Sequence, residues 1–151
     1  MKFIADVNLG KLAKELRMLG FDTTYYRGKD LHELIQLARR MQGVILTRNR
    51  GLISKSTEIQ MILVSEDDPL LQLKGLLRRG IIAIHDVGLF TRCLLCNTRL
   101  EEIAREKAEG NVPDFIYQHH QAFYRCPQCH RLFWPGTHFE KMKKGLESLL
   151  L

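Results

Sequence analysis

The sequence predicts an α/β fold with a parallel sheet, followed by a smaller unit of different architecture. From residue 3 to about residue 80, short apolar segments alternate with segments of helical periodicity. Such alternation is typical of a parallel sheet with helices on both faces. After about Phe90 the pattern becomes irregular and contains two Cys-x-x-Cys pairs. We therefore predict one domain over residues 1–88 and a second, with a C-terminal helix, over residues 89–151.

The first half of the α/β domain is expected to contain two strands and two helices. Residues 3–7 predict a short buried strand that ends in an acid. Residues 9–19 carry leucines at helical spacing before a glycine. β-Branched and aromatic side chains at 23–26 predict a second strand. The second helix should begin at Asp30 and end at Gly43.

The second half repeats the alternation. Residues 44–47 are apolar, as expected of a strand buried on both faces, and residues 60–65 predict a fourth strand. A helix should follow from Pro69 to about Arg79. In parallel sheets, ligands bind beyond the carboxyl ends of the strands. Polar side chains follow three of these ends and should converge there: Asp6, Asn49, Asp67 and Asp68.

Charge and composition limit the class of protein. The chain has 151 residues, a net charge of +6 and a sequence pI of about 9.3, a balance that favours polyanions and most commonly nucleic acid. No apolar run reaches the roughly 18 residues that a membrane span needs. An acid at position 6 is unlike the apolar core of a signal peptide. We therefore expect a cytoplasmic protein without membrane association.

The two Cys-x-x-Cys pairs predict a structural zinc site. Cys93 and Cys96 form one pair, and Cys126 and Cys129 form the other. Each such turn presents two thiolates at adjacent corners of a tetrahedron, and two turns complete it. Disulfides are disfavoured in a reducing cytosol, and zinc binding would supply folding free energy to a segment with few core side chains. The alternative is four buried free cysteines.

Acidic side chains provide candidate ligands for a catalytic metal ion. Hydrolysis of a phosphodiester needs an activated water and neutralisation of the phosphate charge, and Mg²⁺ or Mn²⁺ held by oxygen ligands supplies both. Asp6 follows an apolar strand, where a charge is costly unless it is paired or bound to metal. Helix capping is the alternative role for Asp30, Glu33 and Asp68. The full candidate set is Asp6, Asp30, Glu33, Asp67 and Asp68.

These segments together resemble a known family. From Lys2 to about Met142, the chain is similar to the Mut-seven C-terminal ribonuclease family in FIADVNLGKLAKELRMLGFDTTYYRGKD, ILTRNRGL, LVSEDDPLLQL, RCLLCN and FYRCPQCHRLFWPGTHFEKM. The resemblance implies a PIN-like domain with a C-terminal zinc ribbon. It also implies metal-dependent hydrolysis of RNA phosphodiester bonds.

The resemblance also assigns roles to the acids. Asp6 matches the first acid of a PIN site, and Asp30 and Glu33 match the acidic region of the second helix. Asp67 or Asp68 would be the last acid. Asp6 and Glu33 would then hold the Mg²⁺ or Mn²⁺ ion. The basic side chains expected to contact RNA phosphates are Lys11, Arg48 and Arg50, with ordinary solvation as the alternative.

The chain departs from the family pattern at Asn49, where an aspartate usually follows the Leu-Thr-Arg segment. An amide oxygen can still bind Mg²⁺ or Mn²⁺, but it lacks the charge. Three explanations fit this departure. The remaining acids suffice for catalysis, or the substitution was engineered, or the chain is a catalytically weakened or inactive PIN-fold protein that binds RNA. A further alternative is an adaptor in which aromatic side chains of the ribbon recruit a partner or stack on single-stranded bases. The same side chains could instead form the small core of the ribbon: Phe123, Tyr124, Phe133 and Trp134.

Overall fold

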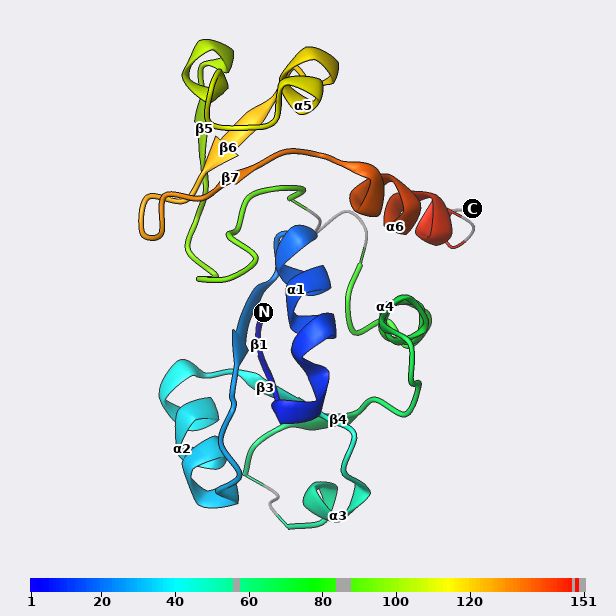
Figure 1. The fold of residues 1–151 in the computed structure, drawn as a ribbon. Coiled ribbons are helices and arrows are strands. Elements are labelled where there is room, and N and C mark those ends of the chain that lie inside the picture. Colours follow the sequence, from blue (N-terminus) through cyan, green and yellow to red (C-terminus); the bar gives the residue numbers. More distant parts are fainter. Residues whose placement is uncertain (56–57, 84–87, 148, 150–151) are drawn as a thin grey trace.

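The protein contains a mixed α/β unit and a smaller ribbon, as predicted (Figure 1). The computed structural model describes residues 1–55, 58–83, 88–147 and 149. Four strands form a parallel sheet in the order β2-β1-β3-β4. Their bounds are β1 (Lys2–Ala5), β2 (Asp22–Tyr25), β3 (Val44–Thr47) and β4 (Met61–Leu63). The predicted α/β fold class with flanking helices is confirmed.

Two strands are shorter than the sequence suggested. β1 ends before Asp6 because the Asp6 carboxylate accepts a hydrogen bond from the Asn8 amide at 3.1 Å and starts a 3₁₀ turn, η1 (Val7–Leu9). β4 is shorter than 60–65, although the pairing continues beyond its ends. The Gln60 carbonyl and the Val64 amide still form hydrogen bonds with β3, at 3.0 Å and 2.8 Å.

One face of the sheet carries the larger apolar core. α1 (Gly10–Met18) and α4 (Pro69–Arg78) pack there, together with the distant α6 (Thr137–Glu147). Figure 1 shows α6 beside α4, although more than fifty residues separate them in the chain. The buried side chains that α6 adds to this core are Phe139, Met142 and Leu146. The C-terminal helix therefore completes the core of the α/β unit.

The opposite face is covered by α2 (Leu31–Met41), which buries Leu34 and Ala38 against Ile4 and Ile45. The sequence predicted that Gly43 ends this helix. Gln42 ends it instead, in the left-handed conformation with φ of 54°. Gly43 serves packing instead, since an added Cβ would lie 3.0 Å from the Ile4 Cδ1 atom. A short helix, α3 (Arg50–Ile53), follows β3.

The ribbon is an antiparallel sheet with a small core of its own. β6 (Phe123–Arg125) lies between β5 (Glu101–Ile103) and β7 (Leu132–Phe133). A 3₁₀ helix, η3 (Arg105–Ala108), and α5 (Asp114–His119) lie between β5 and β6 in the chain. The buried residues of this core are Ala108, Val112 and Phe123.

Aromatic side chains join the ribbon to the α/β unit. Phe90 stacks on Tyr124 with ring centroids 5.8 Å apart and meets Phe139 edge to face at 4.8 Å. Tyr124 and Phe133 pack against the larger core, whereas Phe123 and Trp134 belong to the ribbon core. The division at residues 88/89 stays a prediction, and residues 84–87 beside it lie outside the described residues.

No helix among the described residues is long and apolar enough to cross a membrane.

Candidate functional site

A cavity of about 200 Å³ opens at the carboxyl ends of the parallel strands. Asp6 follows β1, Tyr26 follows β2 and Asn49 follows β3, and all three line the cavity together with Lys29 and Asp30. The polar side chains of Asp6 and Asn49, which the sequence placed at strand ends, are thus brought into one cavity, and Asp30 joins them from the start of α2.

Asp6 is the buried acid of this cavity, with 6% of its surface exposed. Its Oδ2 atom accepts a hydrogen bond from the Thr47 hydroxyl at 2.5 Å, and its Oδ1 atom accepts one from the Asn8 amide at 3.1 Å. Among the described residues, no lysine, arginine or histidine forms an ion pair with Asp6. A buried carboxylate without a cationic side chain is costly unless another cation balances it. Its surroundings therefore fit a bound metal ion.

Asp30 and Glu33 lie at the start of α2 and differ in what they contact. The Asp30 Oδ1 atom accepts hydrogen bonds from the backbone amides of His32 and Glu33, at 2.9 Å and 3.4 Å, so Asp30 caps α2 as the capping interpretation predicted. The Glu33 side chain does not complete a capping box, because it bonds Tyr26 instead. The Glu33 carboxylate accepts a hydrogen bond from the Tyr26 hydroxyl at 2.7 Å, which raises the pKa of Tyr26. Glu33 is exposed and does not line the cavity.

Asn49 is linked to Asp6 through Thr47. The Asn49 backbone amide donates to the Thr47 hydroxyl oxygen at 3.0 Å, and that hydroxyl donates to Asp6. The Asn49 side-chain oxygen accepts a hydrogen bond from the Gly51 amide at 2.9 Å and caps α3. Thr47 was not among the predicted site residues. A polar side chain that ends the apolar segment 44–47 was the available signal.

The structure does not bring Asp67 or Asp68 to the cavity. Asp67 is 91% exposed and forms an ion pair with Arg48. Asp68 caps α4 by accepting hydrogen bonds from two backbone amides, at 2.9 Å and 3.2 Å. The first turn of a helix leaves backbone amides without partners, and Asp68 satisfies two of them.

The predicted RNA-contacting side chains also lie outside the lining of the cavity. Lys11, Arg48 and Arg50 are exposed and do not line it. Among the described residues, Lys29 is the cationic side chain that lines the cavity, and the sequence predicted no role for it at this site.

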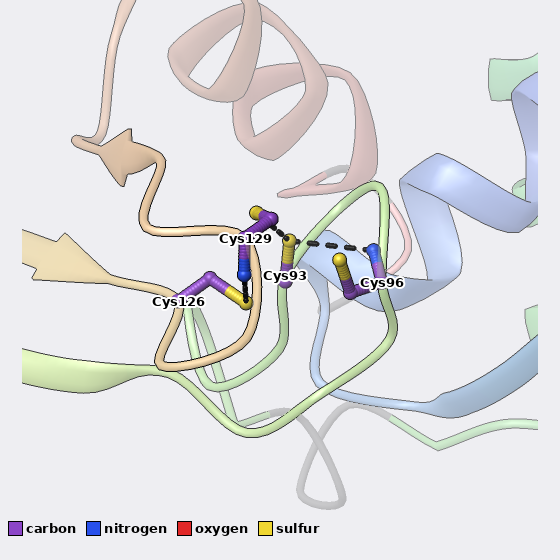
Figure 2. A group of neighbouring side chains, drawn as sticks. All are labelled: Cys93, Cys96, Cys126 and Cys129. Carbon is purple, nitrogen blue, oxygen red and sulfur yellow. Dashed lines mark hydrogen bonds between the residues drawn. The ribbon is translucent and has the colours of Figure 1, made fainter.

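The four cysteines form the predicted cluster (Figure 2). Their sulfur atoms all lie within 4.8 Å of one another, and Cys93 Sγ is 3.7 Å from Cys129 Sγ. A tetrahedral zinc ion with Zn–S bonds of about 2.3 Å requires sulfur atoms about 3.8 Å apart. The backbone amides of Cys96 and Cys129 donate to Cys93 Sγ and Cys126 Sγ, at 3.3 Å and 3.4 Å. The donor set therefore fits zinc, and among the described residues it is the only such group of three or more histidine, cysteine or acidic side chains.

The thiols of this cluster differ in acidity. A hydrogen bond from the backbone of Arg131 lowers the pKa of Cys129 to about 6. Burial raises the pKa of Cys96 to about 12 and raises that of Cys93 as well. Since zinc binds thiolates, its binding must release protons from the buried thiols.

A comparison with protein families identifies the chain. The model of the Mut7-C RNAse domain matches residues 1–146. The chain belongs to the Mut7-C RNAse domain family. This membership supports a ribonuclease-type function with RNA as the substrate class. Comparisons with curated proteins and with solved structures gave no match.

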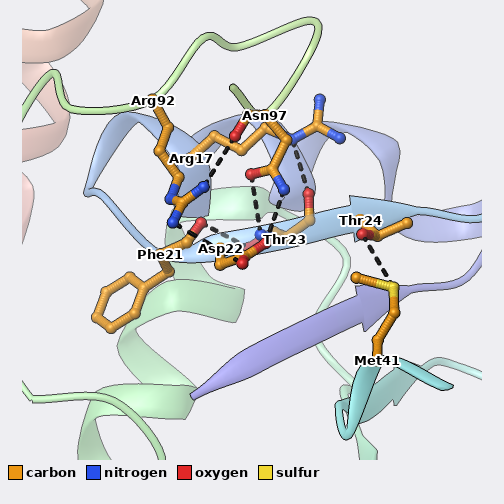
Figure 3. A network of polar contacts seen from close by, with 8 residues as sticks. All are labelled: Arg17, Phe21, Asp22, Thr23, Thr24, Met41, Arg92 and Asn97. Carbon is orange, nitrogen blue, oxygen red and sulfur yellow. Dashed lines mark hydrogen bonds and ion pairs between the residues drawn. The ribbon is translucent and has the colours of Figure 1, made fainter. Parts of the chain in front are cut away.

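In this Mut7-C chain, the first cysteine pair is tied to the edge strand β2 (Figure 3). Asn97, which follows Cys96, accepts a hydrogen bond from the Thr23 amide at 3.1 Å and donates one to the Asp22 carboxylate at 2.7 Å. Its φ of 63° turns the side chain toward the strand. Asn97 therefore occupies a place on β2 that another strand would otherwise take.

Arg17 at the end of α1 makes a second connection. Its Nε atom donates to the Thr23 carbonyl at 2.8 Å, and its Nη1 atom donates to the Leu94 carbonyl at 2.7 Å. Burial lowers the pKa of Arg17, and the nearby Cys93 and Cys96 act in the opposite direction. The contacts of Arg17 with Leu94 and of Asn97 with β2 could not be predicted from local patterns, because their partners lie more than seventy residues apart in the chain.

Proposed function

We propose that the chain is a metal-dependent ribonuclease and that the cavity around Asp6 is its active site. The observation that carries this proposal is the buried Asp6 carboxylate, which has no cationic partner among the described residues and shares a cavity with Asp30 and Asn49. Family membership supports the ribonuclease-type reaction. The oxygen-rich set of side chains supports Mg²⁺ or Mn²⁺ as the ion, because both ions prefer oxygen ligands.

Asp6, Asp30 and Asn49 would hold the divalent ion. The resemblance also implies Glu33 as a ligand, and its carboxylate accepts a hydrogen bond from the Tyr26 hydroxyl. When bound, the ion neutralises charge on the phosphate and makes water a better nucleophile. The Thr47 hydroxyl fixes the orientation of the Asp6 carboxylate and leaves lone pairs on Oδ1 and Oδ2 for a ligand.

Basic side chains around the cavity would hold the RNA backbone. Lys29 lines the cavity and offers a charge to the phosphate that enters it. Arg48 and Arg50 flank Asn49 in the chain and are exposed, so we retain them as contacts for the adjoining phosphates. Lys11 is exposed at the start of α1 and is the most peripheral contact that we propose.

The test is cleavage of labelled single-stranded RNA with Mn²⁺ or Mg²⁺, comparing the protein with Asp6→Asn. A matched control is Asp114→Asn, which makes the same chemical change at an exposed position of the ribbon. We expect cleavage to require the divalent ion and to fall in Asp6→Asn by more than the roughly 10- to 100-fold cost of losing an outer-shell partner. Asp114→Asn should cleave as the parent does. Equal activity of both variants would overturn the assignment of Asp6.

A second candidate function is a catalytically weakened or inactive PIN-fold protein that binds RNA. Asn49 is the observation that favours it, since the amide brings one negative charge fewer to the cavity than the aspartate of the family pattern. Asn49→Asp discriminates the two candidates. If only this variant cleaves RNA, the parent is a disabled nuclease. If no variant cleaves and all bind RNA with a salt-dependent affinity, RNA binding is the function.

A further inference from the structure

A second cavity, of about 570 Å³, lies on the ribbon. It is lined by side chains from three parts of the ribbon: Lys107 of η3, Arg125 of β6, and Arg131 and Trp134 on either side of β7. Among the described residues, none that lines this cavity is acidic. The cavity therefore presents positive charge beside an aromatic ring.

Not all of this charge is free. The Arg125 guanidinium lies 3.8 Å from the Glu101 carboxylate, and this ion pair reduces the positive charge that Arg125 offers to a ligand. Lys107 and Arg131 are exposed, and no ion pair involves either of them among the described residues. The Arg131 side chain also interacts with the Cys129 sulfur of the proposed zinc site, whereas Lys107 lies on a separate element. Lys107 is therefore the cation that can be changed without disturbing the zinc site.

Trp134 is held where a ligand can reach it. Its ring packs against Phe123 of the ribbon core, with centroids 6.5 Å apart, and it also lines the cavity while remaining partly exposed. A ring that is already ordered loses little conformational freedom when a base stacks on it. Cationic side chains combined with an accessible aromatic ring are typical of sites for single-stranded nucleic acid.

We propose that this ribbon cavity is a second RNA-binding site, which takes a single-stranded segment by stacking a base on Trp134 and by phosphate contacts from Lys107 and Arg131. The choice of RNA among polyanions rests on the proposed function. The cysteine cluster joins the start of β2 at Asp22 and Thr23, whereas the Asp6 cavity lies at the carboxyl ends of the strands. Figure 1 shows the ribbon at the opposite end of the molecule from α3. The ribbon site therefore adds affinity for RNA without taking part in the chemistry.

The sole tryptophan of the chain makes this site directly observable. Trp134 fluorescence is measured in the full-length Asp6→Asn variant, so that RNA stays intact, with zinc bound and no Mg²⁺ or Mn²⁺. Oligouridylate is titrated in, and inorganic phosphate and a poly-glutamate peptide serve as comparison ligands. Lys107→Glu is compared with Arg40→Glu. The Arg40 change alters the charge equally at an exposed position of α2, remote from the ribbon.

We expect oligouridylate to quench Trp134 at lower concentration than either comparison ligand. Lys107→Glu should weaken this binding roughly tenfold at low salt and reduce the slope of log K against log salt by about 0.7, the loss of one phosphate contact on a single strand. Arg40→Glu should leave both values within about twofold of the parent. Trp134→Leu, measured by anisotropy of labelled RNA, should lose roughly 5- to 150-fold in affinity.

Several results would overturn the ribbon site. Absence of quenching by RNA at low salt would do so, as would equal effects of the Lys107 and Arg40 changes. Quenching by poly-glutamate at lower concentration than by RNA would replace RNA with an acidic protein segment, and equal quenching by phosphate would leave a general anion site. The ribonuclease proposal is tested separately by cleavage with Asn49 and Asp6 variants. RNA quenching without any cleavage would therefore refute that proposal alone.

Discussion

The α/β unit and the ribbon are stabilised in different ways. The sheet buries apolar side chains on both faces, with α1, α4 and α6 on one and α2 on the other. The ribbon buries Ala108, Val112 and Phe123 in its own core and relies on partly exposed neighbours around them. Burial of apolar surface is therefore sufficient to explain the first unit. The ribbon needs additional free energy, which contacts with the α/β unit supply and which a metal ion bound to the four cysteines would add.

Some of the contacts between the two units lie beside the cysteine cluster. Asn97 and Arg17 connect the first cysteine pair to β2, and Phe90 packs between Tyr124 and Phe139. His138 of α6 also bonds the Glu15 carboxylate of α1, at 2.5 Å. The segment that carries the first cysteine pair therefore also fixes the position of the ribbon on the sheet, and a metal ion bound to the four cysteines would stabilise both arrangements.

The largest expected effect comes from removing the metal. We expect Cys126→Ser, or chelation of zinc, to unfold the ribbon, because structural zinc contributes about 10–16 kcal/mol of apparent binding free energy in small zinc domains. Trp134 emission should shift to the red, while hydrogen exchange of β1 and β3 amides stays slow. Zinc added back after chelation should restore the emission. Simultaneous loss of protection in β1 and β3 would show that the two units unfold as one.

A smaller effect is expected at the contact between the units. Asn97→Gly keeps a backbone that tolerates φ of 63° but removes the amide that pairs Thr23 and Asp22. The partly buried partners left behind should lower the free energy of unfolding by about 1–3 kcal/mol. Chemical denaturation measures the free energy of unfolding, and hydrogen exchange at the Thr23 amide reports the loss of its hydrogen bond.

The control for that experiment is Thr98→Ala. The Thr98 hydroxyl donates to Gln128 at 2.6 Å on the exposed side of the ribbon, so its loss does not affect β2. If both variants exchange the Thr23 amide at the parent rate, the Asn97 side chain does not hold the ribbon on the sheet.

The smallest effect concerns the rim of the acidic cavity. The Glu33 carboxylate accepts the Tyr26 hydroxyl and raises the pKa of Tyr26 above its ordinary value of 10.0. Because the folded pKa is raised, this contact stabilises the fold fully below pH 10.0 and is lost as the pH rises through the folded pKa. An ultraviolet titration should show one tyrosine ionising late.

Two variants assign that late component. Tyr26→Phe should remove it, and Glu33→Gln should move it back toward the ordinary value, since the charged acceptor is gone. Conversely, a late component that persists in Tyr26→Phe belongs to another of the four tyrosines. The stability of either variant near neutral pH should remain close to that of the parent.

Local patterns predicted much of the fold and part of the site. Alternating apolar segments located all four parallel strands within a few residues, because side-chain periodicity reflects burial directly. Strand ends located Asp6 and Asn49 at one cavity, because parallel strands place their carboxyl ends on the same edge. The pattern failed for Asp67 and Asp68, which do not reach the cavity. Asp67 forms an ion pair with Arg48, and Asp68 caps α4.

The sequence by itself determined the α/β class and the four-cysteine cluster, since both follow from short-range spacing. Tertiary structure alone decided that Thr47 bonds Asp6, that Lys29 lines the cavity and that Asn97 pairs with β2. It also decided that α6 completes the core of the α/β unit. These contacts join residues up to 123 positions apart, as for His138 and Glu15, and no local periodicity encodes which distant side chains meet. They follow from how the packed elements place their side chains in space.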